Sequence, residues 1–390
     1  MQDRLYFYLL VLGTIITLAI VSLVSYTQDP DNVYHLPSNQ KNNYEKKYAT
    51  ELLLSDFGLL LDESLNYRDI KTEVAKLASN VDCVVMGSSP SLQISSFNNQ
   101  RSFANECSSI INLSVPGSSI EDYYAFSWLL LQNQNRPKKI IFTLPEWLFN
   151  PAVTTYWFRN QQYQKLMMRE VSPKIQGKET GNELFLKAVV NLINPEYFVK
   201  SIEKIKDGDN SQSIIQANNF DYTVGTKYPV LLPDASLVYS KDYIDRKNNE
   251  AVLIPMEIKW NIGGQKPNKK GKTLTVGRSS INISGHYYSD DVVKMFTNLI
   301  EYLQSKKIAI SFLITPVHHN IVKSPGSSTM LAINDINPMI DKLASKYKIK
   351  IFGSFDPHNI KCNINEFYDS HHVKTSCLSK ITLLPSNFFK

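Results

Sequence analysis

The segment Val84-Val85-Met86-Gly87-Ser88-Ser89 is the strongest indication of the fold in this sequence. An apolar run rich in β-branched residues stops at a glycine and two serines, which is typical of a buried strand that ends in a tight turn. In open α/β folds, ligands bind at the carboxyl ends of such strands. Ser89 is therefore expected where a reactive hydroxyl would meet a substrate.

A carboxylate and an imidazole stand far down the chain, in Asp369-Ser370-His371-His372. A serine hydroxyl is a poor nucleophile until a base removes its proton, and imidazole has a suitable pKa near neutrality. We expect Ser89 to be the nucleophile, His372 the base and Asp369 the acid that orients the imidazole. His371 is the alternative base, because a local rotation would exchange the two rings.

Strand-like and helical patterns alternate along much of the chain. This alternation predicts an α/β fold with a doubly wound parallel sheet that helices cover on both sides. Aromatic residues at helical spacing near residue 124 are expected to pack in the core rather than to bind carbohydrate. The expected strands are 82–86, 110–115, 139–144, 308–315 and 349–352, and the expected helices are 48–79, 289–304, 333–347 and one that begins with the capping box Ser118-Ser119-Ile120-Glu121.

The N-terminal segment Leu5–Tyr26 is almost wholly apolar and carries no charge. About 20 such residues are enough to cross a bilayer as a helix. The segment is longer than an ordinary signal-peptide core and no clear small-residue cleavage site follows it, so we expect an uncleaved anchor, with a cleaved signal peptide as the alternative. The short N-terminus is assigned to the cytoplasm and the large remainder to the outside.

Four cysteines agree with an oxidising compartment. Cys83 opens the first expected strand and Cys107 shortly precedes the second, while Cys362 and Cys377 bracket the Asp369/His372 segment. We expect at least one disulfide among them. The alternative is four small buried apolar side chains.

The net charge of +6 is spread over 390 residues, mostly as scattered lysines. A nucleic-acid footprint needs basic residues clustered on one face, so no nucleic-acid partner is expected. No histidines or cysteines have metal-ligand spacing, and neither a metal nor a cofactor is expected. His318 follows an expected strand, and its two interpretations are a substrate contact and a loop histidine.

These motifs resemble the SGNH (GDSL-like) hydrolase superfamily, especially its membrane-anchored bacterial branch of DltD-like and other polysaccharide O-acyl-modifying proteins. The block Gly87-Ser88-Ser89 matches the family's first motif, and Asp369 with His372 matches its last, Asp-x-x-His. The resemblance implies a flavodoxin-like three-layer fold and an oxyanion hole formed by the backbone of Ser89 and Gly117. The family's third motif, which carries an asparagine, is replaced by Pro145-Glu146-Trp147, so one oxyanion donor lacks a counterpart.

Hydropathy, composition and the strand–helix alternation predict a division of the chain. We expect residues 1–30 to form the anchor, 31–78 a juxtamembrane linker and helix, and 79–150 and 286–390 the two parts of an SGNH-like core. Residues 151–285 interrupt the alternation and are expected to form an inserted cap beside the active-site edge.

The expected function is a membrane-anchored, envelope-facing serine esterase or O-acyltransferase. It would act on ester-linked acyl groups, most plausibly acetyl, of a cell-surface glycan, with a membrane-bound O-acyltransferase as a possible partner. The alternative is a catalytically inactive SGNH scaffold that binds glycan or assists such an acyltransferase. Motifs do not distinguish hydrolysis from transfer, because both reactions use the same residues.

Overall fold

The computed structural model of the chain separates into two compact units. One comprises residues 1–44 and 174–213, and the other comprises residues 45–173 and 214–390. The structure describes residues 2–28, 41–61, 65–97, 102–134, 136–150, 160–171, 192–207, 214–217, 228–240, 244–245, 275–276, 279–280 and 287–383.

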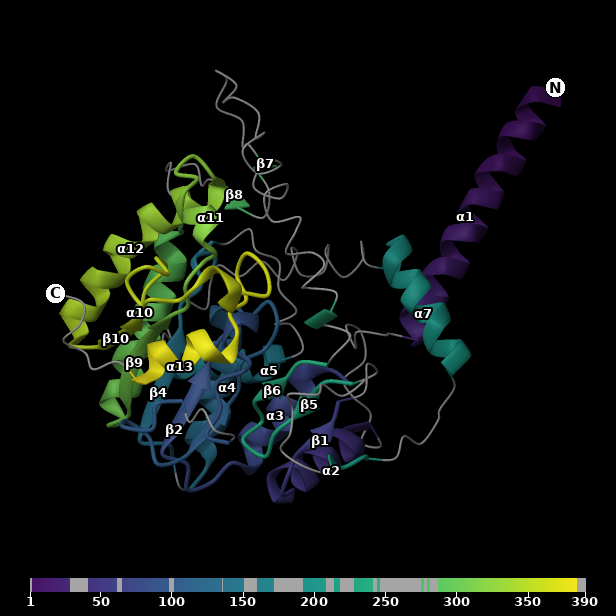
Figure 1. Cartoon of the computed structure of the whole chain (residues 1–390). Coiled ribbons are helices and arrows are strands. Elements are labelled where there is room, and N and C mark those ends of the chain that lie inside the picture. Colours follow the sequence, from purple (N-terminus) through teal and green to yellow (C-terminus); the bar gives the residue numbers. More distant parts are fainter. Residues whose placement is uncertain are drawn as a thin grey trace. The chain divides into compact units, whose positions relative to one another are not determined.

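A parallel sheet of five strands is the centre of the larger unit (Figure 1). The strands lie in the order β10-β9-β4-β2-β3, which is 2-1-3-4-5 when they are numbered along the chain, a common doubly wound order. The predicted α/β class is thus confirmed, and each expected strand overlaps an observed one. Their bounds are β2 Cys83–Met86, β3 Ile110–Asn112, β4 Lys139–Thr143, β9 Ala309–Ile314 and β10 Lys350–Gly353.

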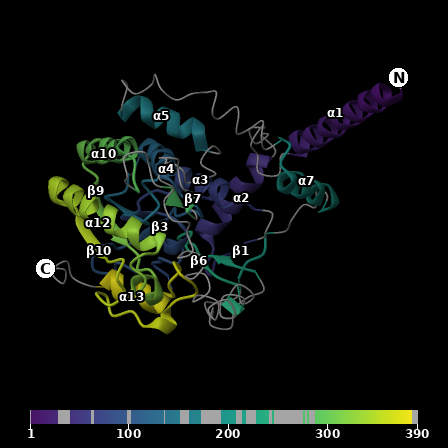
Figure 2. The ribbon, with the colours of Figure 1, turned by 90° about the horizontal axis from the view of Figure 1, so that it is seen from above.

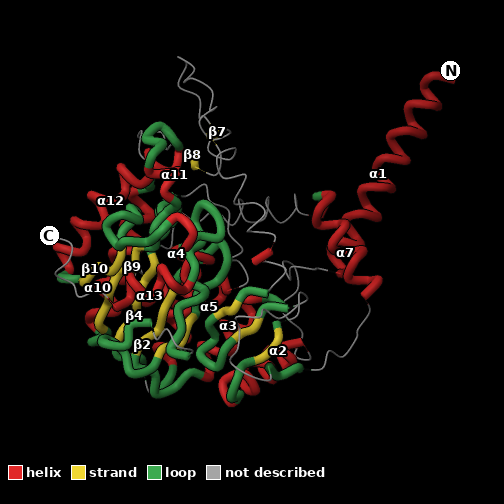
Figure 3. The backbone as a smooth tube through the Cα atoms, viewed as in Figure 1, coloured by secondary structure: helices red, strands yellow, loops and turns green. Residues whose placement is uncertain are grey.

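The two faces of this sheet support separate cores, because successive side chains of a strand point to opposite sides. On one face, Phe142 of β4 packs against Tyr123 of α4 and Phe296 of α10, with ring centroids 5.1 Å and 5.4 Å apart. On the other, Val85 and Ile141 join a cluster with residues of the 94–110 segment and of α13. The strands lie between the helices (Figures 2 and 3). The helices named here are α4 Ile120–Gln132, α10 Asp290–Ser305 and α13 Thr375–Leu383.

The single helix expected over 48–79 is wrong. The structure has α2 (Lys41–Leu54), the short strand β1 (Leu59–Leu60) and α3 (Tyr67–Leu77). Gly58 turns the chain between them with φ +91°, and the Asn66 side chain accepts a hydrogen bond from the Arg68 N–H to cap α3. The capping box of α4 is shifted by one residue from the expected one, with Ser119 and Asp122 as its partners.

The expected cap over residues 151–285 lies largely outside the described residues. Its described pieces have different neighbours. Helix α5 (Gln161–Val171) packs on α4, whereas α7 (Pro195–Asp207) packs on the N-terminal helix α1 (Gln2–Gln28) in the smaller unit. The strands β5 (Val230–Leu231) and β6 (Leu237–Val238) form a hairpin that pairs with β1.

That hairpin also covers the edge of the large sheet. The backbone N–H of Asn112 in β3 donates to the carbonyl of Asp234 at 2.8 Å. The fully buried Lys71 of α3 donates to the carbonyls of Asn112 and Ala235. Burial lowers the pKa of Lys71 to about 7, and the nearby Asp234 carboxylate opposes that shift. These contacts protect an exposed strand edge that would otherwise be open to pairing.

The remaining elements are short, except for one long helix. They are η1 Ser89–Ser91, β7 Thr275–Val276, β8 Ser279–Ser280, α11 His319–Val322, α12 Ser328–Tyr347 and η5 Ile364–Glu366.

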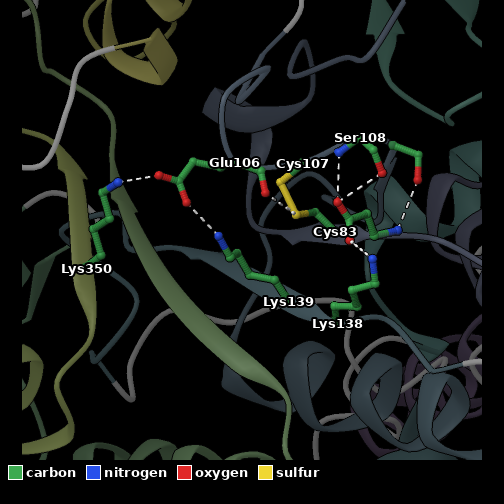
Figure 4. Close-up of a disulfide and its surroundings, with 9 residues drawn as sticks. Cys83, Glu106, Cys107, Ser108, Lys138, Lys139 and Lys350 are labelled. Atoms are coloured by element: carbon green, nitrogen blue, oxygen red, sulfur yellow. Dashed lines mark hydrogen bonds and ion pairs between the residues drawn. A yellow bond between two sulfur atoms is a disulfide. The ribbon is translucent and has the colours of Figure 1, made fainter.

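Two disulfides join Cys83 to Cys107 and Cys362 to Cys377, which confirms the expectation of at least one. The first ties the start of β2 to the segment before β3 (Figure 4). Beside it, the Glu106 carboxylate pairs with Lys139 of β4 at 2.7 Å and with Lys350 of β10. This cross-linked edge is the amino-terminal edge of the sheet, opposite the edge that Ser89 follows.

We expect replacement of both Cys83 and Cys107 by alanine to lower the free energy of unfolding by about 3 kcal/mol, because the bridge restricts the unfolded chain. The bridged residues are 24 positions apart. Thermal unfolding of the full chain in detergent, with and without dithiothreitol, would measure the loss. An unchanged midpoint in the non-reduced variant would contradict the prediction.

The smaller unit contains the helix that the N-terminal sequence predicts. Residues Tyr6–Gln28 of α1 are long and apolar enough to cross a membrane, with a mean hydropathy of 2.5. Most side chains of α1 are exposed in the structure, but Ser25 is fully buried.

Candidate active site

Hydrogen bonds between buried hydroxyl groups stabilise the turn after β2. Ser91 Oγ lies 2.8 Å from Ser114 Oγ and 3.0 Å from Thr143 Oγ1, and Thr143 Oγ1 donates to the Met86 carbonyl. A Cβ on Gly87 would lie 1.5 Å from Thr143 Oγ1 and 2.3 Å from Ser91 Oγ. Glycine is therefore required where the strand turns toward Ser89.

The two serines of the turn have different environments. Ser88 is 1% exposed, and its Oγ accepts a hydrogen bond from the Ser118 N–H at 3.3 Å. Ser89 is half-buried and begins a short 3-10 helix whose second residue is Pro90. Of the two hydroxyls, that of Ser89 is the one that a substrate can reach.

Asn112 at the end of β3 fixes the same turn from the side. Its buried amide donates to the carbonyls of Ser91, Leu92 and Ile94 at 2.8, 3.2 and 2.9 Å. One side chain thus satisfies three carbonyls of the segment that follows Ser89. The sequence suggested no role for Asn112, although an asparagine inside an apolar run is a signal that a buried amide has partners.

The loop after β3 carries Gly117, the expected oxyanion donor. Gly117 has φ +60°, and a Cβ built on it would meet no atom within 4 Å. Its carbonyl accepts a hydrogen bond from Arg68 Nη2 at 3.1 Å, and Arg68 forms a buried bidentate pair with Asp122, with both distances 3.0 Å. The ion pair therefore holds the backbone of this loop in one position.

Asp369 and His372 form a close pair after β10. His372 Nδ1 lies 2.8 Å from both carboxylate oxygens of Asp369, which also accepts the backbone N–H groups of His371 and His372. Burial raises the pKa of Asp369, but the hydrogen bond and charge of His372 and the two backbone bonds outweigh it, so the pKa lies well below its usual range. An ionised carboxylate only accepts, so Nδ1 donates to it, and in the neutral ring Nε2 is the nitrogen that can accept a proton.

His371 is held by a different acid. Its Nε2 lies 2.8 Å from Glu146 Oε1, and its Nδ1 lies 2.8 Å from Ser370 Oγ. Trp147 packs against the ring at 5.5 Å. Both nitrogens are thus engaged, and the geometry favours His372 over His371 as the base.

Glu146 belongs to the segment Pro145-Glu146-Trp147, where the resemblance led us to expect an asparagine. Its side chain is 7% exposed and comes from the turn directly after β4, next to β2 in the sheet. A carboxylate cannot donate to an oxyanion, but here it anchors the loop that carries Asp369 and His372. Sequence reasoning identified the missing asparagine and did not find this partner.

His318 lies beneath the same loop and is 3% exposed. Its backbone N–H donates to the Ser370 carbonyl at 3.0 Å, and its Nδ1 accepts from the Asn320 N–H. Burial lowers the pKa of His318 to about 4, with His319 acting in the same direction and Asp369 opposing it. It is thus a neutral, structural histidine that supports the loop.

Gln93 connects the turn of Ser89 to the loop of His372. Its amide donates to the carbonyl of Val373 at 3.0 Å, and its Oε1 accepts from Tyr368 Oη at 3.4 Å. Within the described residues, however, no hydrogen bond joins Ser89 Oγ to His372. Such catalytic bonds are often long in the absence of substrate. The structure thus gathers the expected residues at one edge of the sheet without closing the serine–histidine bond.

No group of three or more potential metal ligands occurs among the described residues. No protein-family model matches this chain, and no characterised protein matches it in sequence.

We expect Glu146→Ala to lower the free energy of unfolding by about 1 kcal/mol, because the half-buried His371 ring loses its acceptor. Glu146→Gln should keep most of that free energy, since the amide oxygen still accepts. Urea denaturation would measure both changes. Glu301→Ala is the control, because the Glu301 side chain is 54% exposed and its ion pair with Lys346 lies on the surface. Equal losses of unfolding free energy in Glu146→Ala and Glu301→Ala would contradict a stabilising role for the Glu146–His371 contact.

Proposed function

We propose that this protein is a membrane-anchored serine esterase or O-acyltransferase of the SGNH type, with its larger unit outside the cytoplasm. The observation that carries the proposal is the Asp369–His372 pair, in which both carboxylate oxygens lie 2.8 Å from Nδ1. It stands at the sheet edge that also carries the half-buried Ser89. A nucleophile, a base and an orienting acid are the parts that acyl transfer needs.

In this proposal, His372 Nε2 takes the Ser89 proton as Oγ attacks the acyl carbonyl. The backbone N–H groups of Ser89 and Gly117 donate to the developing oxyanion. The alcohol leaves with the proton from His372, and Ser89 holds the acyl group as an ester. Water then releases the acyl group in an esterase, whereas a sugar hydroxyl accepts it in a transferase.

The envelope setting is supported by α1 and by the two disulfides, which are typical of oxidising compartments. A surface glycan with O-acetyl or similar small esters is the proposed substrate. A membrane-bound O-acyltransferase that supplies acyl groups is the proposed partner. Neither a metal nor a cofactor takes part in the scheme.

A second candidate is a scaffold that binds glycan without turning it over. Two observations favour it: Ser89 makes no hydrogen bond to His372 within the described residues, and Glu146 replaces the asparagine donor. Labelling with a fluorophosphonate probe separates the candidates, because only an activated serine reacts. Labelling that requires Ser89 supports the enzyme. No labelling of the correctly folded protein supports the scaffold.

The direction of the reaction would follow from mass spectrometry of surface glycans from cells with and without the protein. More acylation in its absence indicates an esterase, and less indicates a transferase. Unchanged acylation, together with no probe labelling, would overturn the proposed enzyme.

A further inference from the structure

Helix α7 has a wider apolar face than its contact with α1 uses. Tyr197 and Ser201 are 4% and 0% exposed, one helical turn apart, on the side that packs against α1. The next positions around the helix, Phe198 and Ile202, are half-buried, and Ile205 is 50% exposed. An apolar flank therefore remains beside the flank that α1 covers.

The sequence of α7 has the pattern of a helix that lies in a membrane interface. The charged positions of α7 cluster on one side of the helix, with Val199 among them, and are 196, 200, 203, 204, 206 and 207. Phe198, Ile202 and Ile205 fall on the opposite side. A helix with one charged and one broad apolar face, and low net hydrophobicity, is typical of interfacial helices.

The neighbour of α7 indicates what covers the apolar flank. α7 packs on α1, whose residues Tyr6–Gln28 have the length and hydropathy of a membrane span (Figures 1 and 2). Ser25, near the end of that span, is fully buried although most of α1 is exposed. Small residues such as Ser25 and Ser201 allow helices in membranes to approach closely.

We propose that α7 lies in the outer interface of the lipid bilayer beside the end of α1, with Phe198, Ile202 and Ile205 in contact with lipid. This inference rests on the membrane anchor of the proposed function and adds a second membrane contact to it. The chain enters the smaller unit at residue 174 and returns to the larger unit at residue 214, so α7 tethers the catalytic unit at a second point. The protein would thereby be kept beside a substrate or donor at the membrane surface.

The test uses the full chain in vesicles of phosphatidylcholine and phosphatidylglycerol. Single cysteines are introduced by Ile205→Cys in α7, Leu23→Cys in α1 and Leu331→Cys in α12, and each is labelled with an environment-sensitive fluorophore. The three side chains are 50%, 62% and 42% exposed, so all three sites accept a label. Lipids that carry a spin label near the head group then quench fluorophores within the interface.

We expect position 205 to lose about half of its emission, as position 23 does, because an interfacial helix sits about 5–10 Å into the head-group region. Position 331 should lose none. Quenching at 23 with none at 205 would overturn the inference while the anchor stands. No quenching at 23 would remove the anchor itself, and with it both the proposed localisation and this inference.

Discussion

Replacing Ser89 by alanine is expected to abolish probe labelling and to lower turnover of a small aryl ester by at least about a thousandfold. His372→Ala should have a similar effect. Asp369 contacts Nδ1 of the ring, so Nε2 is the nitrogen that can take the Ser89 proton. The double variant should lose little more, since members of a triad contribute as one unit. Asp369→Asn should keep a measurable remnant. Steady-state kinetics and fluorophosphonate labelling of the purified full chain would measure all four.

The neighbouring residues are the controls for this prediction. Ser88→Ala removes a buried hydrogen-bond acceptor, and His371→Ala removes a ring that contacts Glu146 and Ser370. Both variants should mainly lower the free energy of unfolding and have only a small effect on kcat. If Ser88 or His371 proves essential while Ser89 or His372 is dispensable, the assignment of roles fails. The proposed reaction class would survive that result, because the same edge of the sheet would still carry it.

Gly87→Ala is expected to cost about 3 kcal/mol or more in the free energy of unfolding, because overpacking a rigid site forces the backbone to move. The added Cβ would lie 1.5 Å from Thr143 Oγ1. Since Ser89 is two residues away, turnover in the folded fraction should also fall by about a hundredfold. Chemical denaturation and aryl-ester kinetics would separate the two losses.

Two further variants make this result specific. Thr143→Ala in the Gly87→Ala background removes the closest atom and should recover part of the lost stability. Gly326→Ala is the matched control, because a Cβ there meets nothing within 4 Å. A loss at Gly326 equal to that at Gly87 would mean that crowding under the turn is not the cause.

Periodicity was sufficient to predict the strands and most helices near the site. The apolar run Ile140-Ile141-Phe142 in β4 is buried, as expected for a parallel sheet covered on both faces, so the local sequence predicts this strand. The prediction of one helix over 48–79 failed at a tertiary contact. Gly58, with φ +91°, lies so close to Leu231, a residue distant in sequence, that a Cβ would be 2.2 Å from the Leu231 carbonyl oxygen.

Local sequence was enough to predict β2 and the turn that carries Ser89, the Asp-x-x-His spacing of Asp369 and His372, and an apolar N-terminal segment of membrane-spanning length. Each is local, since one turn or one helix contains it. Three contacts are visible only in the tertiary structure. They are the hydrogen bonds from His371 to Glu146, from the Asn112 amide to the turn after β2, and from Arg68 to the Gly117 carbonyl. Those pairs join residues from different strands and helices. Their contacts exist only once the strand order brings the carboxyl ends of β2, β3 and β4 together, and buried polar groups then bind the nearest partner that satisfies them.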